Sequence, residues 1–353
     1  MPRRLRIATW NVCWFNRLFD DLGGLLVDDE WSGVRDVTRR RQAVAIARVL
    51  HRVDADIFAI IEAPDTGGRR STVAALERFA VAAKLRAREA TIGFPSHTEQ
   101  EIALLYDPAR VTVSHAPQGR KVTPKTAQHS TEAAPRFDGV FPLDLDGDGE
   151  LDLHRFSKPP LEAAVRIDDR ERLRLIAVHA KSKAPHGAES AAEAAALSLL
   201  NRRKQLAQCA WLRARIDEHL DAGDDVIALG DFNDGPGQDK YERVFGRSGV
   251  EVVIGSPDEP ERRLRTPFVR AHSPSQPRPS TARFFKGGSK RYLNALIDFV
   301  MLSPDLADRT APDWRIWHPF DDAESYANET FKTDLLDASD HFPVSVDLTF
   351  PDV

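Results

Sequence analysis

The sequence predicts an α/β fold that carries a site at the ends of its strands. The chain opens as a strand, a helix and a second strand, and later apolar runs again alternate with a helical segment. Three apolar runs stop at a polar residue, namely Asn11, Glu62 and Asp231. Ligand sites in layered α/β proteins form at strand ends, because loops bend away there from a rigid scaffold.

The N-terminal elements follow from their hydrophobic spacing. Residues 5–11 alternate loosely between apolar and polar, which indicates a strand, and residues 35–53 place apolar side chains at helical intervals. Residues 56–61 form a short apolar run that is typical of a strand buried on both faces. The next predicted elements are a helix over 73–85 and strands over 102–106 and 111–113.

The rest of the chain alternates in the same way. Residues 173–178 form another apolar strand, which His179 ends, and an alanine-rich helix over 189–220 stops before Gly223. Residues 226–229 form a buried strand that leads into Gly230-Asp231. The last predicted strands cover 293–302 and 344–350, and polar insertions are expected near 114–160 and 255–282.

The distribution of candidate site residues decides the expected domain count. Proline and serine cluster at 272–280, which suits a surface loop and would also suit a linker. Candidate site residues fall on both sides of this cluster, so a boundary there would split the site. We therefore expect one domain over residues 1–353.

Composition and charge limit the setting in which the chain works. A content of 42% hydrophobic and 29% charged residues is that of a globular protein with a sizeable core. No apolar signal region follows the basic N-terminus, no apolar run reaches the ~20 residues of a membrane span, and only two cysteines occur. We expect a cytoplasmic protein, although a trimmed secreted form would look the same.

Short segments bring reactive side chains together. In Gly230-Asp231-Phe232-Asn233 the Asp and Asn lie two residues apart on an extended segment, so they point to the same side. Asp340 precedes His341, whose side chain is the best suited to move protons near neutral pH. Asp298 lies in an otherwise apolar strand, where a buried carboxylate needs a partner such as a histidine.

Six short motifs resemble those of one known family in order and spacing. They are Thr9-Trp10-Asn11, Ile61-Glu62, Val178-His179-Ala180-Lys181-Ser182, Gly230-Asp231-Phe232-Asn233, Ile297-Asp298-Phe299-Val300 and Ser339-Asp340-His341-Phe342-Pro343-Val344. Each alone is weakly specific, but together they resemble the endonuclease/exonuclease/phosphatase (deoxyribonuclease I-like) superfamily over about residues 5–350. The resemblance implies a four-layer α/β sandwich, in which two mixed sheets pack face to face with helices outside.

The resemblance also implies a metal site. Asn11 and Glu62 resemble ligands of Mg²⁺, and Asp340 resembles a residue near the same ion. Mn²⁺ would be able to substitute. Mg²⁺ prefers hard oxygen ligands and keeps several waters, so one or two carboxylates suffice to hold it. The sequence leaves open whether one metal ion or two take part.

Five further residues resemble catalytic groups. His179 and Asn233 resemble groups that contact the scissile phosphate, and Asp298 with His341 resembles an acid–histidine pair. Asp231 resembles the carboxylate beside the attacking water. Either Asp231 or His341 is able to act as the general base, and the sequence does not separate the two.

Three basic residues are expected to contact the substrate: Lys158, Lys181 and Arg283. Relatives often have arginine before proline where this chain has Lys158, which keeps the charge but loses the bidentate fork. The glutamate that supports the histidine in deoxyribonuclease I has no clear counterpart, because Glu99 and Glu101 both lie near the right place.

The acidic segment 144–152 permits two interpretations. Acids at loop positions one, three, five and nine, with glycine at six, match the start of a Ca²⁺-binding EF-hand loop, but position twelve is Arg155 instead of glutamate. The flanking leucines alternate like two strands around an Asp-Gly turn. We expect a hairpin here in preference to a structural Ca²⁺ site.

Phosphodiester hydrolysis by in-line attack of an activated water is the function that these patterns favour. A nuclease acting on DNA or RNA would use the local basic stretches, because the net charge of −5 gives no overall attraction for polyanions. The alternative is a phosphodiesterase or phosphatase that acts on a small molecule or phospholipid, which suits the pI of about 6.1. A binding module without activity is disfavoured, because every expected catalytic position is filled.

Overall fold

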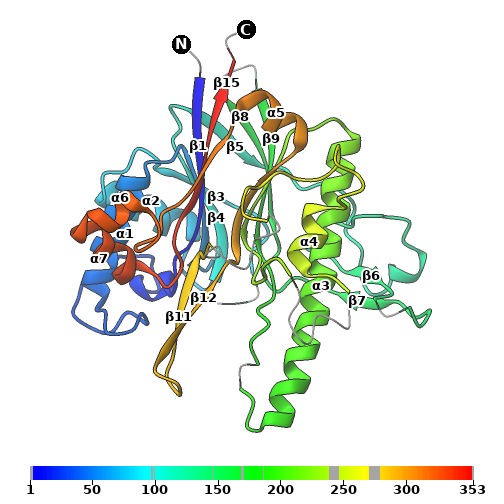
Figure 1. Cartoon of the computed structure of the whole chain (residues 1–353), viewed down its shortest axis with the longest axis horizontal. Coiled ribbons are helices and arrows are strands. Elements are labelled where there is room, and N and C mark those ends of the chain that lie inside the picture. Colours follow the sequence, from blue (N-terminus) through cyan, green and yellow to red (C-terminus); the bar gives the residue numbers. More distant parts are fainter. Residues whose placement is uncertain are drawn as a thin grey trace.

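Two mixed β-sheets lie face to face in the computed structural model of the chain, and helices cover the outer side of each sheet (Figure 1). The structure describes residues 3–351 apart from 97, 99, 146, 168–170, 186, 238–245 and 270–278. The order of the layers is helix, sheet, sheet, helix. The predicted four-layer α/β sandwich is confirmed.

The first sheet contains both ends of the described chain. Its strands are, in spatial order, β14 (Asp313–Ile316), β15 (Val344–Phe350), β1 (Arg3–Asn11), β2 (Ile57–Pro64), β4 (Gln100–Tyr106) and β3 (Glu89–Ile92). β1 runs parallel to β2 and antiparallel to β15. The last strand of the chain therefore returns beside the first.

The second sheet places the two strands that were predicted from apolar runs next to each other. Its spatial order is β13 (Asp298–Leu302), β10 (Val226–Asp231), β9 (Glu171–His179), β8 (Leu161–Ile167) and β5 (Val111–His115). β9 and β10 are parallel, and the other neighbours are antiparallel. The strands predicted from the apolar runs at 173–178 and 226–229 are β9 and β10.

A continuous apolar core fills the space between the sheets. Ile7 and Ile57 of the first sheet and Leu175, Leu229 and Val300 of the second are fully buried in it. Successive side chains of a strand point to opposite faces, so the residues between these pack on the outer helices. Both sheets are thus apolar on both faces, as the continuous apolar runs predicted.

The helices divide between the two outer layers. α1 (Arg39–Val53), α2 (Thr72–Ala82) and α7 (Glu329–Ala338) pack on the first sheet, and α3 (Ala191–Asp221) and α4 (Gly249–Ile254) pack on the second. The remaining short helices are η1 (Phe15–Leu18), η2 (Ala127–His129), α5 (Pro304–Thr310) and α6 (Ala323–Ala327). Over the described ranges, every helix is too short or too polar to cross a membrane.

The helix predicted over 35–53 begins later than expected. The Thr38 hydroxyl accepts a hydrogen bond from the Arg41 amide and caps α1, which therefore starts at Arg39. The residues before the cap form a loop in which Trp31 bridges to Thr38. Hydrophobic spacing alone does not reveal where such a cap starts the helix.

Two hairpins lie outside the main sheets. β6 (Phe141–Leu143) pairs with β7 (Asp152–His154), which confirms the hairpin predicted around the acidic segment. The Asp144 carboxylate accepts hydrogen bonds from the amides of Gly147 and Gly149 in the turn. Asp146 lies outside the described residues, so the Ca²⁺ interpretation of this turn is not tested.

The prediction of a single strand over 293–302 was wrong, because this segment forms parts of two separate strands, β12 and β13. β12 (Arg291–Ala295) pairs with β11 (Ala282–Lys286) in a projecting hairpin, whereas β13 joins the second sheet (Figure 1). The Thr281 hydroxyl accepts hydrogen bonds from the amides of Ile297 and Asp298, both at 3.0 Å. This side chain satisfies the backbone where the chain leaves the hairpin and enters the sheet.

A buried ion cluster fixes α3 to the region that was expected to be an insertion. The guanidinium of Arg215 donates to the carbonyl oxygens of Gln118 and Ala134 and lies 3.8 Å from Glu162. His219 bridges Glu162 at 2.8 Å and Asp224 at 2.7 Å. Residues 118–134 are thereby held by charge-assisted bonds, although they contain little regular structure.

Replacing Arg215 by Met is expected to lower the free energy of unfolding by about 3–5 kcal/mol, because it leaves Glu162 buried without its cation. The side chain of Arg215 is only 2% exposed. A suitable control is Arg262→Met, because the Arg262 side chain, which pairs with Asp217 and Asp221 of α3, is 31% exposed. The control should lose about 1 kcal/mol or less in urea unfolding. Equal losses for the two variants would contradict the role given to Arg215.

Candidate active site

Three predicted residues lie side by side at one edge of the second sheet. Asp231 at the end of β10 is level with His179 at the end of β9 and with Asp298 at the start of β13. The registers of two neighbouring strand pairs therefore bring these side chains together. The apolar residues that precede His179 and Asp231 bury each strand and fix its end.

A glycine is required where β10 reaches this edge. Gly230 has a φ of +134°, and a Cβ atom at this position would lie 2.0 Å from the carbonyl oxygen of Val178 on β9. Only glycine allows the two strands to approach so closely. The glycine that precedes Asp231 thus sets the distance between Asp231 and His179.

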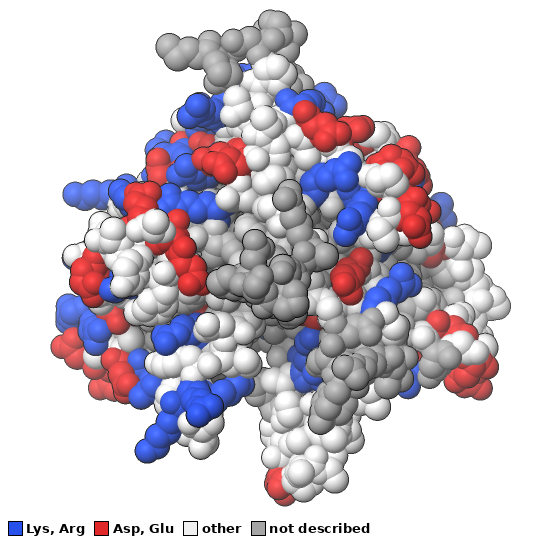
Figure 2. All heavy atoms as spheres, in the orientation of Figure 1, with Lys and Arg blue, Asp and Glu red and all other residues white. Residues whose placement is uncertain are grey.

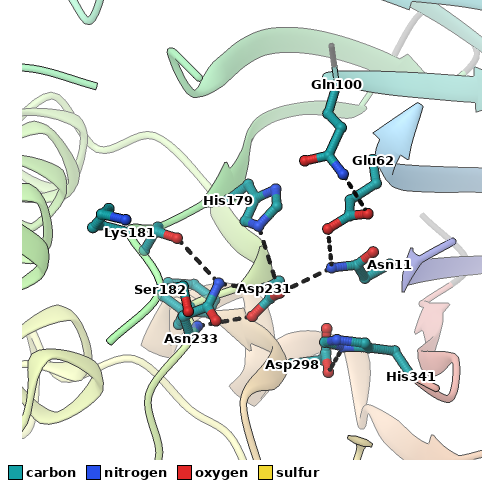
Figure 3. Close-up of polar contacts among 12 residues, drawn as sticks. Asn11, Glu62, Gln100, His179, Lys181, Ser182, Asp231, Asn233, Asp298 and His341 are labelled. Carbon is teal, nitrogen blue, oxygen red and sulfur yellow. Dashed lines mark hydrogen bonds and ion pairs between the residues drawn. The ribbon is translucent and has the colours of Figure 1, made fainter. Parts of the chain in front are cut away.

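The first sheet supplies Asn11, Glu62, Asp340 and His341. Asn11 ends β1, and the pair Asp340-His341 lies just before β15, which neighbours β1. Glu62 lies at a β-bulge in β2 and has a φ of +65°, which is uncommon for a residue with a side chain. A bulge re-aims a side chain at a sheet edge, and here it turns Glu62 toward Asn11 (Figure 3).

These side chains converge on one cavity of about 1220 Å³ between the ends of the two sheets. The predicted site residues that line it are Asn11, Glu62, Lys158, His179, Lys181, Asp231, Asn233, Asp340 and His341. Asp298 does not line the cavity and contacts it through His341. All eight residues predicted for catalysis or metal binding are therefore grouped around one space.

Asp298 and His341 form a buried pair. The Nδ1 atom of His341 lies 2.9 Å from a carboxylate oxygen of Asp298. Burial lowers the pKa of His341, but the negative charges of Asp298, Asp231 and Asp340 outweigh burial and raise this pKa to about 10. The imidazole is therefore expected to be protonated at neutral pH, with its Nε2 side free to face the cavity.

Asp231 occupies the centre of the hydrogen-bond network (Figure 3). Its carboxylate accepts hydrogen bonds from the backbone amide of Asn233 at 2.8 Å, the Nδ2 of Asn11 at 3.0 Å and the Nδ2 of Asn233 at 3.3 Å. Burial and the neighbouring charge of Asp298 raise the pKa of Asp231 to about 7. A carboxylate with such a pKa is able to accept and release a proton near neutral pH.

His179 lies beside Asp231 but differs from His341 in charge. Its Nε2 is 3.7 Å from Asp231, which is beyond hydrogen-bond distance. Burial, together with the positive charges of Lys158 and His341, holds the pKa of His179 well below its usual range. His179 is therefore neutral, and its Nδ1 has no hydrogen-bond partner within the described part of the chain.

The glutamate expected to support His179 is not identified. Glu101 accepts hydrogen bonds from the amides of Ser96 and Thr66, so its carboxylate is committed elsewhere. Glu99 lies outside the described residues. The residue between them, Gln100, reaches the site instead, and its Nε2 donates to Glu62 at 2.6 Å.

The oxygen atoms around Asn11 suit a divalent cation. The Oδ1 of Asn11 is buried and has no hydrogen-bond partner among the described residues, whereas its Nδ2 faces Glu62 and Asp231. Glu62 and Asp340 add two carboxylates to the same cavity. An unpaired buried carbonyl beside two carboxylates is a set of hard oxygen donors of the kind that Mg²⁺ prefers. The residues present therefore fit such an ion.

A second group of potential metal ligands overlaps this site. One ligand atom from each of Asp231, Asp298 and His341 lies within 4.8 Å of the others. The negative charges of Asp298 and Asp231 both favour the protonated form of His341, so the imidazolium ring already neutralises part of their charge. The oxygen set around Asn11 is the better match to Mg²⁺, because it contains no nitrogen donor.

Two of the three predicted substrate contacts lie in the cavity. Lys158 and Lys181 both line it, and burial lowers the pKa of each. Arg283 lies outside the cavity lining, where its guanidinium stacks 3.6 Å from the ring centroid of Tyr292 and 4.9 Å from that of Phe320. Successive side chains of β11 point to opposite faces, so Phe284 and Lys286 face the cavity in its place.

Several residues without a predicted role support the site. The Ser339 hydroxyl donates to the Asn11 carbonyl at 2.8 Å and accepts from the His341 amide at 3.1 Å. The Trp10 indole donates to the His341 carbonyl at 2.9 Å. Phe284 packs edge-on against the His341 ring. Ser339 and Trp10 lie within the family-like motifs, next to predicted site residues. This position in the sequence could have identified them as supporting residues.

Comparisons with known proteins agree with this fold. A sequence model described as the Endonuclease/Exonuclease/phosphatase family matches residues 8–341. No curated protein has a matching sequence. The solved structure of ANGEL2, a 2′,3′-cyclic phosphatase, in complex with adenosine-2′,3′-vanadate is 10% identical, with a TM-score of 0.51 over 99% of this chain and 96% of that chain. This likeness concerns the fold.

Two other solved structures have slightly lower TM-scores. An endonuclease/exonuclease/phosphatase family protein from Bacteroides thetaiotaomicron is 14% identical, with a TM-score of 0.49 over 100% of both chains. Truncated TDP2 from Caenorhabditis elegans is 13% identical, with a TM-score of 0.49 over 99% of this chain and 98% of that chain.

Proposed function

This chain belongs to the endonuclease/exonuclease/phosphatase family, and from this premise we propose that it is a Mg²⁺-dependent phosphodiester hydrolase that acts on nucleic acid. One observation carries the proposal. The carboxylate of Asp231 and the Asp298–His341 pair lie at the same cavity as the hard oxygen atoms of Asn11, Glu62 and Asp340. Phosphoester hydrolysis needs both a proton acceptor and charge stabilisation, and this cavity offers both.

Asp231 is the general base in this proposal. Its raised pKa matches the task of taking a proton from water near neutral pH, whereas a protonated His341 has no lone pair with which to do so. The Asn233 amide and the Asn11 side chain hold the Asp231 carboxylate in place. The water that Asp231 activates attacks phosphorus in line with the leaving oxygen.

The other residues stabilise the charge of the phosphoryl group. The imidazolium of His341, oriented by Asp298, faces the cavity as a hydrogen-bond donor. The neutral His179 ring adds a donor at the same edge, and Lys158 adds a positive charge. The Asn233 side chain also lines the cavity, where its Nδ2 donates to the Ala180 carbonyl and to Asp231. Asn11, Glu62 and Asp340 would hold a Mg²⁺ ion, which would supply Lewis-acid stabilisation of the phosphoryl oxygens.

Replacing Glu62 by Gln tests the metal site. We expect the Mg²⁺ concentration for half-maximal hydrolysis to rise about 10- to 100-fold, because one anionic oxygen is lost while the shape is kept. Glu89→Gln is a matched control, since Glu89 lies on the edge strand β3 and bonds to Tyr106. An unchanged Mg²⁺ requirement in Glu62→Gln, measured on a small phosphodiester, would show that Glu62 is not a ligand.

The choice of substrate is tested separately. Nucleic acid is favoured by the basic residues at the cavity, Lys158, Lys181 and Lys286. The alternative is a small-molecule or phospholipid phosphate ester, which the net charge of −5 favours. Rates on single- and double-stranded DNA and RNA, phospholipids and simple diesters, all with Mg²⁺, decide between the two. Fast hydrolysis of the last two substrate groups with intact nucleic acids would overturn the nucleic acid assignment.

A further inference from the structure

We propose that an exposed ridge of aromatic and arginine side chains beside the cavity binds single-stranded nucleic acid. The members of this aromatic ridge are Trp14, Arg17, Trp31, Arg35, Phe285 and Tyr292. The inference rests on the proposed function, because it specifies the form of the nucleic acid that reaches the cavity. None of these residues was singled out as part of the hydrolytic site.

The ridge begins at the mouth of the cavity. Trp14 lines the cavity, and its backbone amide donates to Glu62 at 3.4 Å. The guanidinium of Arg17 lies 4.7 Å from the ring centroid of Trp14 and 5.1 Å from that of Trp31. Trp14 is 38% exposed and Trp31 is 58% exposed. A cation thus joins two indoles that remain accessible to a ligand.

The backbone holds these indoles in place without burying them. Trp14 has a φ of +59°, a left-handed conformation that is strained for a bulky residue. Gly33, with a φ of +108°, lies so close that a Cβ atom there would be 2.6 Å from the Cγ of Trp14. The indole nitrogen of Trp31 donates to the Val34 carbonyl at 2.8 Å. Loop residues 31–34 therefore fix both rings at the surface.

The same loop continues the ridge onto the projecting hairpin. The guanidinium of Arg35 lies 3.8 Å from the ring centroid of Phe285, and it donates to the Tyr292 hydroxyl at 3.5 Å. Tyr292 is 47% exposed. Phe285 and Tyr292 also contact each other, with ring centroids 5.3 Å apart. The ridge thus consists of two groups, one at the cavity with Trp14, Arg17 and Trp31, and one where the loop meets the hairpin.

The charge of this surface suits a polyanion. The hairpin over residues 282–295 contains no acid, and its basic residues are Arg283, Lys286, Lys290 and Arg291. Figure 2 shows these basic side chains gathered over the hairpin at the lower left of the view. Lys286 lines the cavity, whereas Arg283 lies with Phe285 and Tyr292 on the other face of the hairpin, so both faces carry positive charge. Phosphates would be attracted along the path that the aromatic rings follow.

The loop also contains acids, but arginines neutralise three of them. The pairs are Asp28 with Arg39 at 3.0 Å, Asp29 with Arg40 at 3.1 Å and Asp36 with Arg35 at 3.3 Å. Glu30, which precedes Trp31, belongs to none of these pairs, so the negative charge beside the rings is compensated in part. A single exposed indole is ordinary on a protein surface, but two neighbouring groups of rings in contact with arginines are not.

Single strands fit this surface better than duplexes do. Bases in a duplex are stacked inside the helix, whereas bases in a single strand are free to stack on protein rings while the backbone follows a basic groove. Stacking tolerates any base, because each has a flat face. The aromatic ridge has both components and leads directly to the cavity that would cleave the strand.

Binding is best measured without turnover, using the full chain with Asp231→Asn and labelled 20-nucleotide DNA or RNA in fluorescence anisotropy. We expect tighter binding of the single strand than of its duplex. Adding Trp31→Ala should weaken single-strand binding at least about fivefold, while Trp31→Phe should restore most of it, because it keeps a ring. Tyr326→Ala is the matched control, since Tyr326 is 57% exposed and lies under Lys332, away from the ridge, and it should change nothing.

Unchanged single-strand binding in Trp31→Ala, or a duplex that binds more tightly than the single strand, would overturn the proposal. Binding to anionic phospholipid vesicles that depends on Trp31, without single-strand binding, would overturn it in favour of a membrane. The two proposals fail separately. If the unmodified chain cleaves nucleic acid but Trp31 does not affect binding, only the ridge is wrong. If Trp31 affects single-strand binding but no nucleic acid is cleaved, only the proposed function is wrong.

Discussion

Replacement of Asp231 by Asn is expected to lower kcat by about 10²–10⁴-fold, because the amide cannot take a proton from the attacking water. The side chain keeps its shape and remains between Asn11 and Asn233, so the variant should stay folded, with a thermal midpoint close to that of the unmodified protein. Steady-state rates on a small phosphodiester at saturating Mg²⁺ measure the effect. A kcat within about tenfold of the unmodified value would exclude Asp231 as the base.

The pH profile gives the same test a second readout. Because burial raises the pKa of Asp231 to about 7, the carboxylate gains a proton as the pH falls, and activity should decrease on the acidic side. A cation bound near Glu62 favours the ionised carboxylate, so this acidic limb should move to lower pH as Mg²⁺ increases. The limb should be absent from the residual activity of Asp231→Asn. A limb that persists unchanged in the variant belongs to another group.

Replacement of His341 by Gln is expected to lower kcat by about 10²–10³-fold, and Asp298→Asn by a smaller factor, since Asp298 acts only by orienting and charging His341. The double variant should be no worse than about twofold below His341→Gln alone, because residues that act as a unit are not additive. Kinetics of the two single variants and the double variant form the cycle. Fully additive losses would mean that Asp298 has a role of its own.

The same variants can be compared by the pH dependence of their activity, which would not change if Asp298 had only a structural role. The negative charge of Asp298 is the main cause that raises the pKa of His341 against the effect of burial. Asp298→Asn should therefore lower this pKa, and activity that needs the imidazolium should fall off at a lower pH than in the unmodified protein. The profile between pH 7 and 10 would show this shift. An alkaline limb that does not move would show that Asp298 does not control the protonation of His341.

Much of the fold could be predicted from the sequence because its central strands are buried on both faces. Continuous apolar runs predicted β2, β9 and β10, and these lie at the middle of the sheets. The short or alanine-containing strands β3, β8 and β14 gave no comparable signal and were not predicted. Their place depends on pairing with neighbouring strands of the sheets, which outweighs local preference. The break between β12 and β13 depends in the same way on the Thr281 hydroxyl, which lies far from it in sequence.

The site residues that lie within short motifs could be predicted from the sequence. Asp231, Asn233 and His341 were found from their spacing and resemblance, and the structure groups them with the other predicted residues. Arg283 was expected to contact substrate from its place in a basic stretch, but strand alternation turns it toward Tyr292 and Phe320. Gln100 had no motif to mark it, because it reaches Glu62 only through the pairing of β2 with β4.

Chelation of divalent cations distinguishes metal-dependent hydrolysis of phosphodiesters in this cavity from any metal-independent activity. Purified protein is treated with EDTA, and hydrolysis of bis(p-nitrophenyl) phosphate is followed with and without added Mg²⁺, beside Asp231→Asn under the same conditions. We predict activity that disappears on chelation, returns with Mg²⁺ or Mn²⁺ and is about 10²–10⁴-fold lower in Asp231→Asn. Activity that survives chelation, or that is equal in the unmodified protein and Asp231→Asn, would contradict it.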